Sequence, residues 1–360
     1  MKIGIIGFGE RNFIPYVEVY ENELKKANIQ YECIFWDRFK DSFVSKNSNE
    51  YTVHVRCEPG ISKFKKIIPM LKFKQQIEKI LRKEQYTHLI VLTTLPGVLI
   101  HKILLKQYAD KYILDIRDYS YEKYSWYKKI VEKLIASSYF TAISSNGFKR
   151  FLPQSDKIIT CHNIGSDFPE EKEVVDLKNK EKITIGFVGG IRYFEENCKL
   201  INIFANNPKY QLAYVGRKNL DCDLEAYCEK NVIKNVLFQG DFNNADKLEI
   251  YKKIDFINAI YGNGSLEVTT ALPNRLYDGI LFKKPIIASK GTYLGEVVDK
   301  YKLGIVVNVN DMEELVMNQI NMYIRDFNNI DFFRGCNLFS KDVFREQSIF
   351  MNKIKVFILS

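Results

Sequence analysis

The chain has 360 residues, which is too long for one ordinary hydrophobic core and predicts two domains. Hydrophobic residues make up 46% of the chain, enough to form two cores. Lys and Arg outnumber Asp and Glu by 53 to 44, and the net charge of +9 favours anionic partners such as nucleotide or lipid phosphates. The composition excludes a disordered or fibrous chain. No stretch approaches the roughly 20 apolar residues that a membrane span requires.

The amino terminus and the cysteines both favour the cytoplasm. The apolar run after Lys2 is too short for a signal peptide and ends in glycines. The seven cysteines are scattered and contain no Cys-x-x-Cys pair, a distribution that indicates neither a disulfide framework nor a zinc site. We therefore expect a cytoplasmic protein without a bound metal.

The first half of the chain alternates apolar strands with helices. Strands are expected at 2–6, 31–36, 87–93, 112–116 and 139–143, and helices at 12–27, 70–83, 99–108 and 124–137. This alternation predicts a parallel sheet that is covered on both faces.

A polar segment interrupts the alternation before it starts again. The later strands are expected at 183–188, 210–215, 236–238, 256–260, 285–288 and 304–307, followed by a long helix at 341–359. The predicted fold is α/β, with two Rossmann-like domains facing each other across a cleft. The first domain spans 1–165, the linker 166–182 and the second domain 183–340, and helix 341–360 crosses back to the first domain.

The first strand runs into a glycine turn that contains Gly7, Gly9 and Glu10. A dinucleotide-binding fingerprint would have a third glycine where Asn12 stands, although Asp37 ends the second strand as a ribose-binding residue would. The turn therefore leaves two interpretations open. One is a tight connection on the acceptor side of an active site, and the other is an NAD-dependent oxidoreductase.

The second half opens with a similar turn, in which Gly189 and Gly190 precede Arg192. Glycines allow a ligand to approach the backbone, and a guanidinium suits a diphosphate. The alternative is an exposed Arg192 in a salt bridge.

The segment 271–289 carries the most information, because it predicts a short helix that leads into a buried strand. The free N–H groups at the start of that helix, near Asn274, favour a phosphate. Arg275 adds positive charge, and Asp278, on the same face three residues later, could accept hydrogen bonds from a ribose.

This segment resembles the nucleotide-sugar site of group 1 (family 4) glycosyltransferases of the GT-B type. Their pattern there is Pro-x-Lys/Arg-hydrophobic-x-acid, seven residues before a Pro-Ile-Ile or Pro-Val-Ile strand. Asp278 stands where the family has the second Glu of its Glu–seven residues–Glu motif, which binds the ribose. Thr270 stands where the family has the first Glu, a departure that leaves the donor sugar open.

Shorter matches extend the resemblance over most of the chain. Residues 187–192 resemble the loop for the donor diphosphate, and Gly240 and Asp241 lie in a turn that resembles the nucleobase site. Residues 115–118 resemble a strand end on the acceptor side, and 143–147 with 162–163 resemble the end of that domain.

The resemblance implies transfer of a sugar from a nucleotide-diphosphate sugar to a hydroxyl of a glycan or lipid-linked acceptor, with retention and without a metal or other cofactor. Arg192, Arg275 and the helix start would stabilise the leaving diphosphate. Asp118 would orient or deprotonate the acceptor hydroxyl, unless it is a structural partner of Arg117 or Tyr119. A composition rich in Lys, Ile, Asn and Tyr suggests a low-GC bacterium, so the resemblance implies capsule or O-antigen synthesis.

Residues 61–83 interleave eight Lys or Arg residues with apolar ones and contain a single Glu. This pattern suits the surface of an anionic membrane, which would hold the enzyme near a lipid-linked acceptor. The alternative is an ordinary amphipathic helix.

Two other classes of protein share part of this pattern. A nucleotide-sugar epimerase has a similar two-domain shape, but it would need acid and base groups around one sugar, and no obvious set is present. A nucleic-acid binder is suggested by charge alone and lacks a recognisable module, so we expect no nucleic-acid partner.

Overall fold

The computed structural model describes residues 1–40, 43–58, 65–164, 176–219 and 221–360. The chain forms two compact units. Unit 1 consists of Met1–His162 and Arg345–Ser360, and unit 2 of Asn163–Phe344. Most of the linker expected at 166–182 lies outside the described residues.

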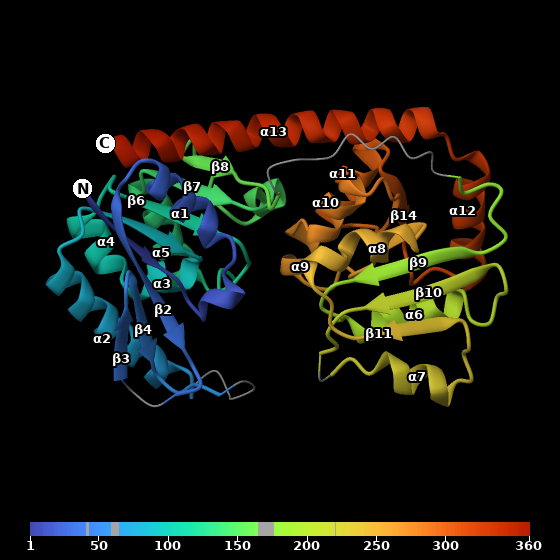
Figure 1. Cartoon of the computed structure of the whole chain (residues 1–360), viewed down its shortest axis with the longest axis horizontal. Helices are drawn as coiled ribbons and strands as arrows, with labels where there is room; N and C mark the ends of the chain where they lie inside the picture. Colours follow the sequence, from blue (N-terminus) through green and yellow to red (C-terminus); the bar gives the residue numbers. More distant parts are fainter. Residues whose placement is uncertain (41–42, 59–64, 165–175, 220) are drawn as a thin grey trace. The chain divides into compact units, whose positions relative to one another are not determined.

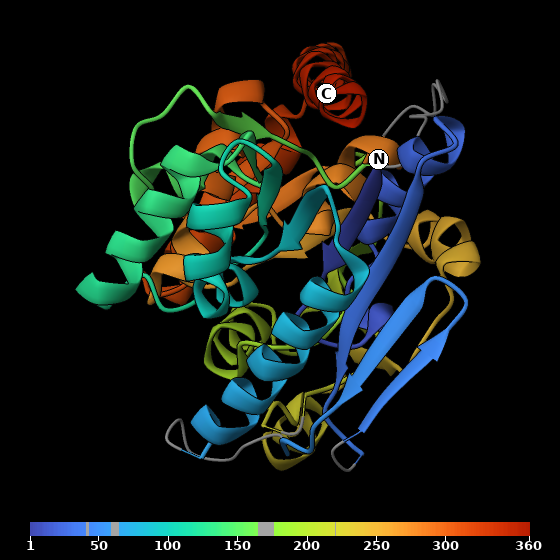
Figure 2. The same cartoon turned by 90° about the vertical axis from the view of Figure 1, so that its left-hand side faces the viewer.

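Unit 1 is built on an eight-stranded sheet with the order β3-β4-β2-β1-β5-β6-β7-β8. All neighbouring strands are parallel except the edge pair β3 and β4, which Figure 2 shows as the light-blue arrows next to the darker blue β2. The strands are β1 (Lys2–Ile6), β2 (Gln30–Asp37), β3 (Phe43–Asn47), β4 (Glu50–His54), β5 (His88–Leu92), β6 (Tyr112–Ile116), β7 (Phe140–Ile143) and β8 (Ile158–Thr160).

Helices cover both faces of this sheet because its central strands are buried along their whole length. On one face α1 (Val17–Lys26) and the end of α13 (Asn329–Leu359) belong to one core with the central strands, where Phe350 packs against Tyr20 of α1 and Phe140 of β7. The helices of unit 1 are η1 (Arg11–Phe13), α1 (Val17–Lys26), α2 (Ile67–Glu84), α3 (Thr94–Leu99), α4 (His101–Gln107), α5 (Ser125–Ser137) and η2 (Asn146–Arg150).

Unit 2 is built on a six-stranded, fully parallel sheet with the order β11-β10-β9-β12-β13-β14. The strands are β9 (Ile183–Val188), β10 (Tyr210–Val215), β11 (Val236–Gln239), β12 (Phe256–Ala259), β13 (Ile286–Ser289) and β14 (Gly304–Val307). The helices are α6 (Phe194–Ile203), α7 (Leu224–Lys230), η3 (Asn244–Asp246), α8 (Lys247–Lys252), α9 (Leu266–Thr270), α10 (Asn274–Leu281), α11 (Tyr293–Tyr301), α12 (Glu313–Asp326) and α13 (Asn329–Leu359).

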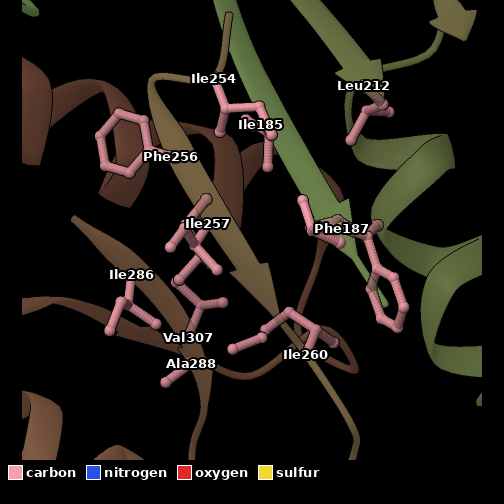
Figure 3. Packing of buried hydrophobic residues seen from close by; sticks show 14 of the residues in the cluster. Ile185, Phe187, Leu212, Ile254, Phe256, Ile257, Ile260, Ile286, Ala288 and Val307 are labelled. Carbon is pink, nitrogen blue, oxygen red and sulfur yellow. The ribbon is translucent and has the colours of Figure 1, made fainter. Parts of the chain in front are cut away.

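The core of unit 2 is formed by branched and aromatic side chains that project from neighbouring parallel strands. Figure 3 shows Ile185 and Phe187 of β9 close to Ile257 of β12, with Ile286 of β13 beyond them. All four are fully buried. Burial on both faces explains why these strands are continuous apolar runs in the sequence.

The strand order confirms the predicted fold. Numbered along the chain, β11-β10-β9-β12-β13-β14 is 3-2-1-4-5-6, and the central strands of unit 1 repeat that order. This is the doubly wound Rossmann arrangement.

Two predicted helix starts were wrong, and one hairpin was missed. The first helix begins at Val17 rather than at residue 12, because Pro15 disfavours helical backbone at Ile14 and only a 3-10 turn precedes it. The hairpin of β3 and β4 was not predicted. The last helix begins at Asn329 and contains 31 residues, the red helix of Figure 1. Within the described ranges, no helix has both the length and the apolar character of a bilayer span.

Candidate active site

The loops that follow β9 and β12 lie at the point where the strand order of unit 2 reverses. β9 is hydrogen-bonded to β10 on one side and to β12 on the other, and all these strands point the same way. Open parallel sheets bind ligands beyond the carboxyl ends of their strands at such a reversal. The predicted donor residues after these strands therefore lie where a ligand is expected.

The loop after β9 packs backbone against backbone on the loop after β10. The Gly189 N–H donates to the Val215 carbonyl at 2.9 Å, and the Ile191 N–H to the Arg217 carbonyl at 2.9 Å. A Cβ added at Gly216, where φ is +134°, would lie 2.2 Å from the Gly189 carbonyl oxygen. Gly216 is therefore required for the Gly189 loop to take this position.

Arg275, at the start of α10, lies directly beside the Gly189 loop. Its Nε donates to the Val188 carbonyl at 2.7 Å, and its Nη1 donates to the Tyr261 hydroxyl at 2.7 Å and to the Asn258 carbonyl at 3.4 Å. The guanidinium also covers the Phe187 ring. Nη2 lies 3.7 Å from the position of a Cβ at Gly189, and it makes no hydrogen bond to any residue that the structure describes. A buried, fixed cation thus directs one unused donor group towards the glycine loop.

Arg192 is exposed at the end of the same loop. Buried Asn197 fixes the backbone there, because its Nδ2 donates to the carbonyls of Arg192 at 2.7 Å and of Tyr193 at 2.9 Å. The Asn197 Oδ1 accepts from the Tyr214 hydroxyl at 3.0 Å. Asn197 was missed in the sequence, where the only signal was an Asn next to the apolar positions of the helix 194–203.

Asp278 is buried one turn after Arg275, and it already has two partners. Lys247 Nζ lies 3.0 and 3.1 Å from its two oxygens, and the Tyr251 hydroxyl donates to Oδ2 at 2.9 Å. Burial, followed by the charge of Asp278, raises the pKa of Tyr251, which therefore remains a donor. A carboxylate has about four lone-pair positions, so one remains for a ligand hydroxyl. Lys247 and Tyr251 were not predicted.

A pocket of about 400 Å³ opens between the loops after β9, β10 and β11. Gly240 and Asp241, the predicted nucleobase turn, form one wall, and a Cβ at Gly240 would contact nothing within 4 Å. The opposite side is formed by residues that the sequence reasoning missed: Ile191, Gly216, Arg217 and Lys218. A glycine directly after a predicted strand, as at Gly189, was the available signal.

A larger hollow of about 580 Å³ lies beside α11, α12 and α13, lined by Tyr301, Tyr323 and Phe332 among others. It includes Gly304, the first residue of β14. It is therefore at the amino-end edge of the sheet, where open α/β sheets do not place their ligands, and we assign the site to the smaller pocket.

Thr270 and Asn274 belong to the same region. Thr270 is fully buried at the end of α9, where its hydroxyl donates to the Leu266 carbonyl at 2.6 Å. Asn274, the first residue of α10, is exposed, and its Oδ1 accepts from Asn163 Nδ2 at 2.7 Å. The helix start that was predicted to bind a phosphate is therefore open at the surface of unit 2.

In unit 1, Asp118 is exposed just after β6. Arg117 turns inward instead: its Nε and Nη2 donate to the two oxygens of fully buried Asp115 at 2.6 and 2.8 Å. The Tyr20 hydroxyl donates to the same carboxylate at 2.8 Å. Arg117 is therefore paired with Asp115. This rigid ion pair lies at the end of β6, and Asp118 follows directly after it.

The turn after β1 holds the other predicted acceptor-side residues. A Cβ at Gly7 would lie 2.7 Å from the Phe35 ring, and the Gly9 carbonyl, at φ +153°, accepts from the Trp36 N–H at 3.1 Å. Glu10 follows, half-buried. Packing against β2 therefore accounts for both glycines.

The acidic residue of the oxidoreductase alternative, Asp37, has two partners in unit 1. Asp37 Oδ2 lies 2.8 Å from His54 Nδ1, and Oδ1 accepts from the Phe39 N–H at 2.8 Å. In addition, α1 begins at Val17, well after the glycine turn, whereas a dinucleotide turn leads directly into its helix. The late start of α1 disfavours NAD binding.

Solved structures that share this fold include sucrose-phosphate synthase from Thermosynechococcus elongatus, which is 14% identical and matches over 99% of this chain and 95% of its own, with a TM-score of 0.68. Anabaena Alr3699/HepE in complex with UDP is 13% identical over 99% of both chains, with a TM-score of 0.67. WaaG, a glycosyltransferase involved in lipopolysaccharide biosynthesis, is 10% identical over 98% of this chain and 99% of its own, with a TM-score of 0.63.

A protein from Listeria monocytogenes described as a UDP-N-acetylglucosamine 2-epimerase also aligns, with 9% identity over 93% of this chain and 90% of its own and a TM-score of 0.56. No protein-family model and no curated protein sequence matches the chain. At these identities the comparisons establish the fold, which is that of the GT-B glycosyltransferases.

Proposed function

We propose that this protein is a glycosyltransferase that uses a nucleotide-diphosphate sugar. The observation that carries the proposal is the buried Arg275 guanidinium, which directs its Nη2 towards the Gly189 loop at the strand reversal of unit 2. A fixed cation next to a glycine backbone and a helix start suits a diphosphate. The fold shared with sucrose-phosphate synthase and WaaG supports the same reaction class.

The donor would lie across the carboxyl ends of β9, β10 and β11. The pocket beside Gly240 and Asp241 would hold the base, and Asp278 would accept a hydrogen bond from the ribose. UDP is the first nucleotide to test, because the HepE structures of the same fold contain UDP or UDP-glucose. The buried Thr270, in place of the family's first Glu, leaves the sugar to be identified by a screen.

The reaction breaks the bond between the anomeric carbon of the sugar and the diphosphate oxygen, and negative charge develops on the leaving diphosphate. Arg275 and Arg192 would stabilise that charge, together with the N–H groups at the start of α10. The family resemblance supports retention of configuration and independence from metals. Asp118 would orient or deprotonate the acceptor hydroxyl.

The acceptor is proposed to be a lipid-linked glycan of bacterial capsule or O-antigen synthesis, and the enzyme is proposed to act in the cytoplasm. The family resemblance supports this part, as does the fold shared with WaaG.

We further propose a peripheral contact with an anionic membrane through the start of α2. Ile67, Ile68 and Leu71 are 49%, 64% and 47% exposed, and exposed Lys65 and Lys72 flank them. Residues 61–64 of the predicted segment lie outside the described residues. Since Phe73, Ile77, Ile80 and Leu81 are buried, the rest of the helix is an ordinary packed helix, and only its first turns would touch lipid.

Flotation with vesicles that contain about one third anionic lipid tests this contact. Replacing Lys65, Lys66 and Lys72 with Gln should abolish flotation, whereas Lys79→Gln with Lys83→Gln, at the far end of the same helix, should not. Equal flotation of all variants would disprove the contact.

Isothermal titration with UDP, ADP, GDP and NAD tests the main proposal. We expect micromolar binding of one nucleoside diphosphate and no comparable binding of NAD; the reverse would overturn the proposal. A screen of the matching nucleotide sugars for thermal stabilisation, followed by hydrolysis assays on those that bind, would then identify the donor.

The epimerase is the second candidate, because the same fold occurs in the Listeria protein. An epimerase converts its nucleotide sugar without an acceptor. Proton NMR of the bound nucleotide sugar alone separates the two: slow hydrolysis supports the transferase, and a change of sugar stereochemistry supports the epimerase.

A further inference from the structure

Arg38 lies directly after β2, at the carboxyl-end edge of the sheet in unit 1. Its guanidinium carbon is 4.8 Å from the centroid of the Trp36 ring and 5.1 Å from that of Phe8. Its Nη2 donates to the Phe8 carbonyl at 3.3 Å. Phe8 stands between the two glycines of the turn after β1, so the cation is held against that turn.

The charge of Arg38 is not neutralised. Within the described ranges, no carboxylate lies within 4.0 Å of it, and its Nε is buried without a hydrogen-bond partner. Burial lowers the pKa of Arg38. The nearby Cys57, Glu10 and Tyr121 act in the opposite direction and only partly offset this effect. Arg38 as a whole is half-buried, and holding a cation there without a counter-ion is unfavourable, so the two rings beside it are not a full explanation for its position.

A second unusual feature lies at the same edge of the sheet. Thr93, immediately after β5, has φ +74° and ψ 163°, a conformation that a β-branched residue rarely adopts. Its N–H donates to the Asp115 carbonyl at 2.6 Å, which fixes it in place. β1 lies between β2 and β5, so Arg38 and Thr93 flank the strand reversal of unit 1 from either side. Strain and an unpaired cation at a strand reversal both indicate a ligand site.

We propose that Arg38 binds a phosphate-type anion on the acceptor, so that the acceptor of the reaction is a phosphorylated molecule. This inference rests on the proposed function, since it treats unit 1 as the acceptor-binding unit. Among the described residues, the guanidinium of Arg38 has a free donor on Nη1 for a phosphate oxygen, whereas its unpartnered Nε is buried. The phosphate can belong to a polyprenyl carrier or to a soluble sugar phosphate, and the chemistry that recognises it is the same.

Direct binding to the full-length protein tests the proposal. UDP is added at saturation so that the Arg192 and Arg275 region is filled. Farnesyl phosphate, below its micelle concentration, and inorganic phosphate are then titrated separately by calorimetry. We expect Arg38→Met to weaken the binding of both anions at least tenfold and Arg38→Lys to weaken it less. Arg82→Gln, an exposed arginine of α2, should bind as the unchanged protein does.

Thermal unfolding separates a ligand site from a structural role. Met preserves the packing against Trp36 and Phe8 and removes the unpaired charge, so Arg38→Met should unfold at the same or a higher temperature. A large drop in the unfolding temperature with unchanged anion affinity would assign Arg38 to stability and overturn the proposal.

The remaining outcomes are also decisive. If farnesyl phosphate binds more tightly than inorganic phosphate, the site exists and recognises a lipid carrier. If the two bind equally, the site exists and recognises the phosphate group alone. If the unchanged protein binds neither anion at millimolar concentration, the proposal is wrong. UDP affinity is measured separately on both proteins. If the unchanged protein does not bind UDP, the proposed function is wrong. Arg38→Met should bind UDP as tightly as the unchanged protein does.

Discussion

The guanidinium carbon of Arg275 lies 3.2 Å from the centroid of the Phe187 ring, and the ring belongs to the strand whose loop would hold the donor diphosphate. A guanidinium stacked in this way cannot rotate away, because Val188 and Tyr261 also hold it at its edges. Its direction towards the Gly189 loop is therefore set by the core of unit 2 before any ligand arrives.

Arg275→Lys should weaken UDP binding by about 2 kcal/mol, or roughly 30-fold, because an ammonium cannot reproduce the planar fork. The affinity for uridine, which has no phosphate, should not change. Calorimetry with both ligands measures the difference. The control is Arg325→Lys, an exposed arginine of α12. If uridine and UDP lose affinity equally, Arg275 acts on the shape of the site rather than on the diphosphate.

Asp278→Ala should weaken UDP binding about tenfold if its free lone pair accepts from the ribose. The substitution also leaves Lys247 without its partner, so loss of affinity alone would not identify the contact. The comparison of UDP with 2′-deoxy-UDP does. The unchanged protein should prefer UDP, and Asp278→Ala should bind both equally. A preference that survives the substitution would remove Asp278 from the ribose site.

Gly216→Ala should lower the unfolding temperature and abolish UDP binding. The added methyl group would collide with the Gly189 carbonyl oxygen at 2.2 Å, and alanine is strained at φ +134°. Gly240→Ala is the matched control at the rim of the same pocket, since its methyl group would meet nothing within 4 Å. Differential scanning calorimetry should show a large loss for the first variant and almost none for the second. A fully stable Gly216→Ala would contradict the described loop packing.

Glu84, at the end of α2, should make unit 1 sensitive to acid. Hydrogen bonds from Lys2 and then from Tyr51 lower the pKa of Glu84 from 4.5 to about 2. An acid whose pKa is lower in the folded state stabilises the fold above its unfolded pKa and loses that contribution as the pH falls through its folded pKa. The stabilisation is therefore complete above pH 4.5 and disappears between about pH 4.5 and 2.

Glu84→Gln should accordingly lower the unfolding temperature at pH 7, and the gap from the unchanged protein should close as the pH approaches 2. Circular dichroism melts over this range measure it. Glu18→Gln, an exposed residue of α1, serves as control and should show no such closing gap. A gap of constant size at all pH values would mean that the charge of Glu84 does not contribute.

The sequence predicted most strands and glycine turns because parallel strands buried on both faces are unbroken apolar runs. It also predicted that Arg275 and Asp278 lie one turn apart on a single helix, since both belong to one short segment; their roles in binding stay predictions. It could not supply Lys247 or Tyr251, which reach Asp278 from α8, about 30 residues earlier in the chain. Such pairs are determined by packing between distant segments, and no local pattern records them.

The hairpin of β3 and β4 escaped prediction for a different reason. β3 is an edge strand with mostly exposed side chains, so it lacks the apolar run that marks the central strands. Arg38 escaped as well, because a cation after a strand is indistinguishable in sequence from a solvated one. Only the burial of its Nε and the absence of a counter-ion among the described residues distinguish it.

Unit 1 is assembled from both ends of the chain, Met1–His162 and Arg345–Ser360. Phe350, Ile354, Phe357 and Ile358 of α13 are at most 3% exposed and belong to the same core as the first strand. The unit that leaves the ribosome first therefore cannot complete its core until the helix at the other end of the chain has been synthesised. While unit 2 is being translated, the rings of Tyr20, Tyr139 and Phe140 that pack against those side chains remain uncovered, which makes nascent unit 1 a natural client for a chaperone.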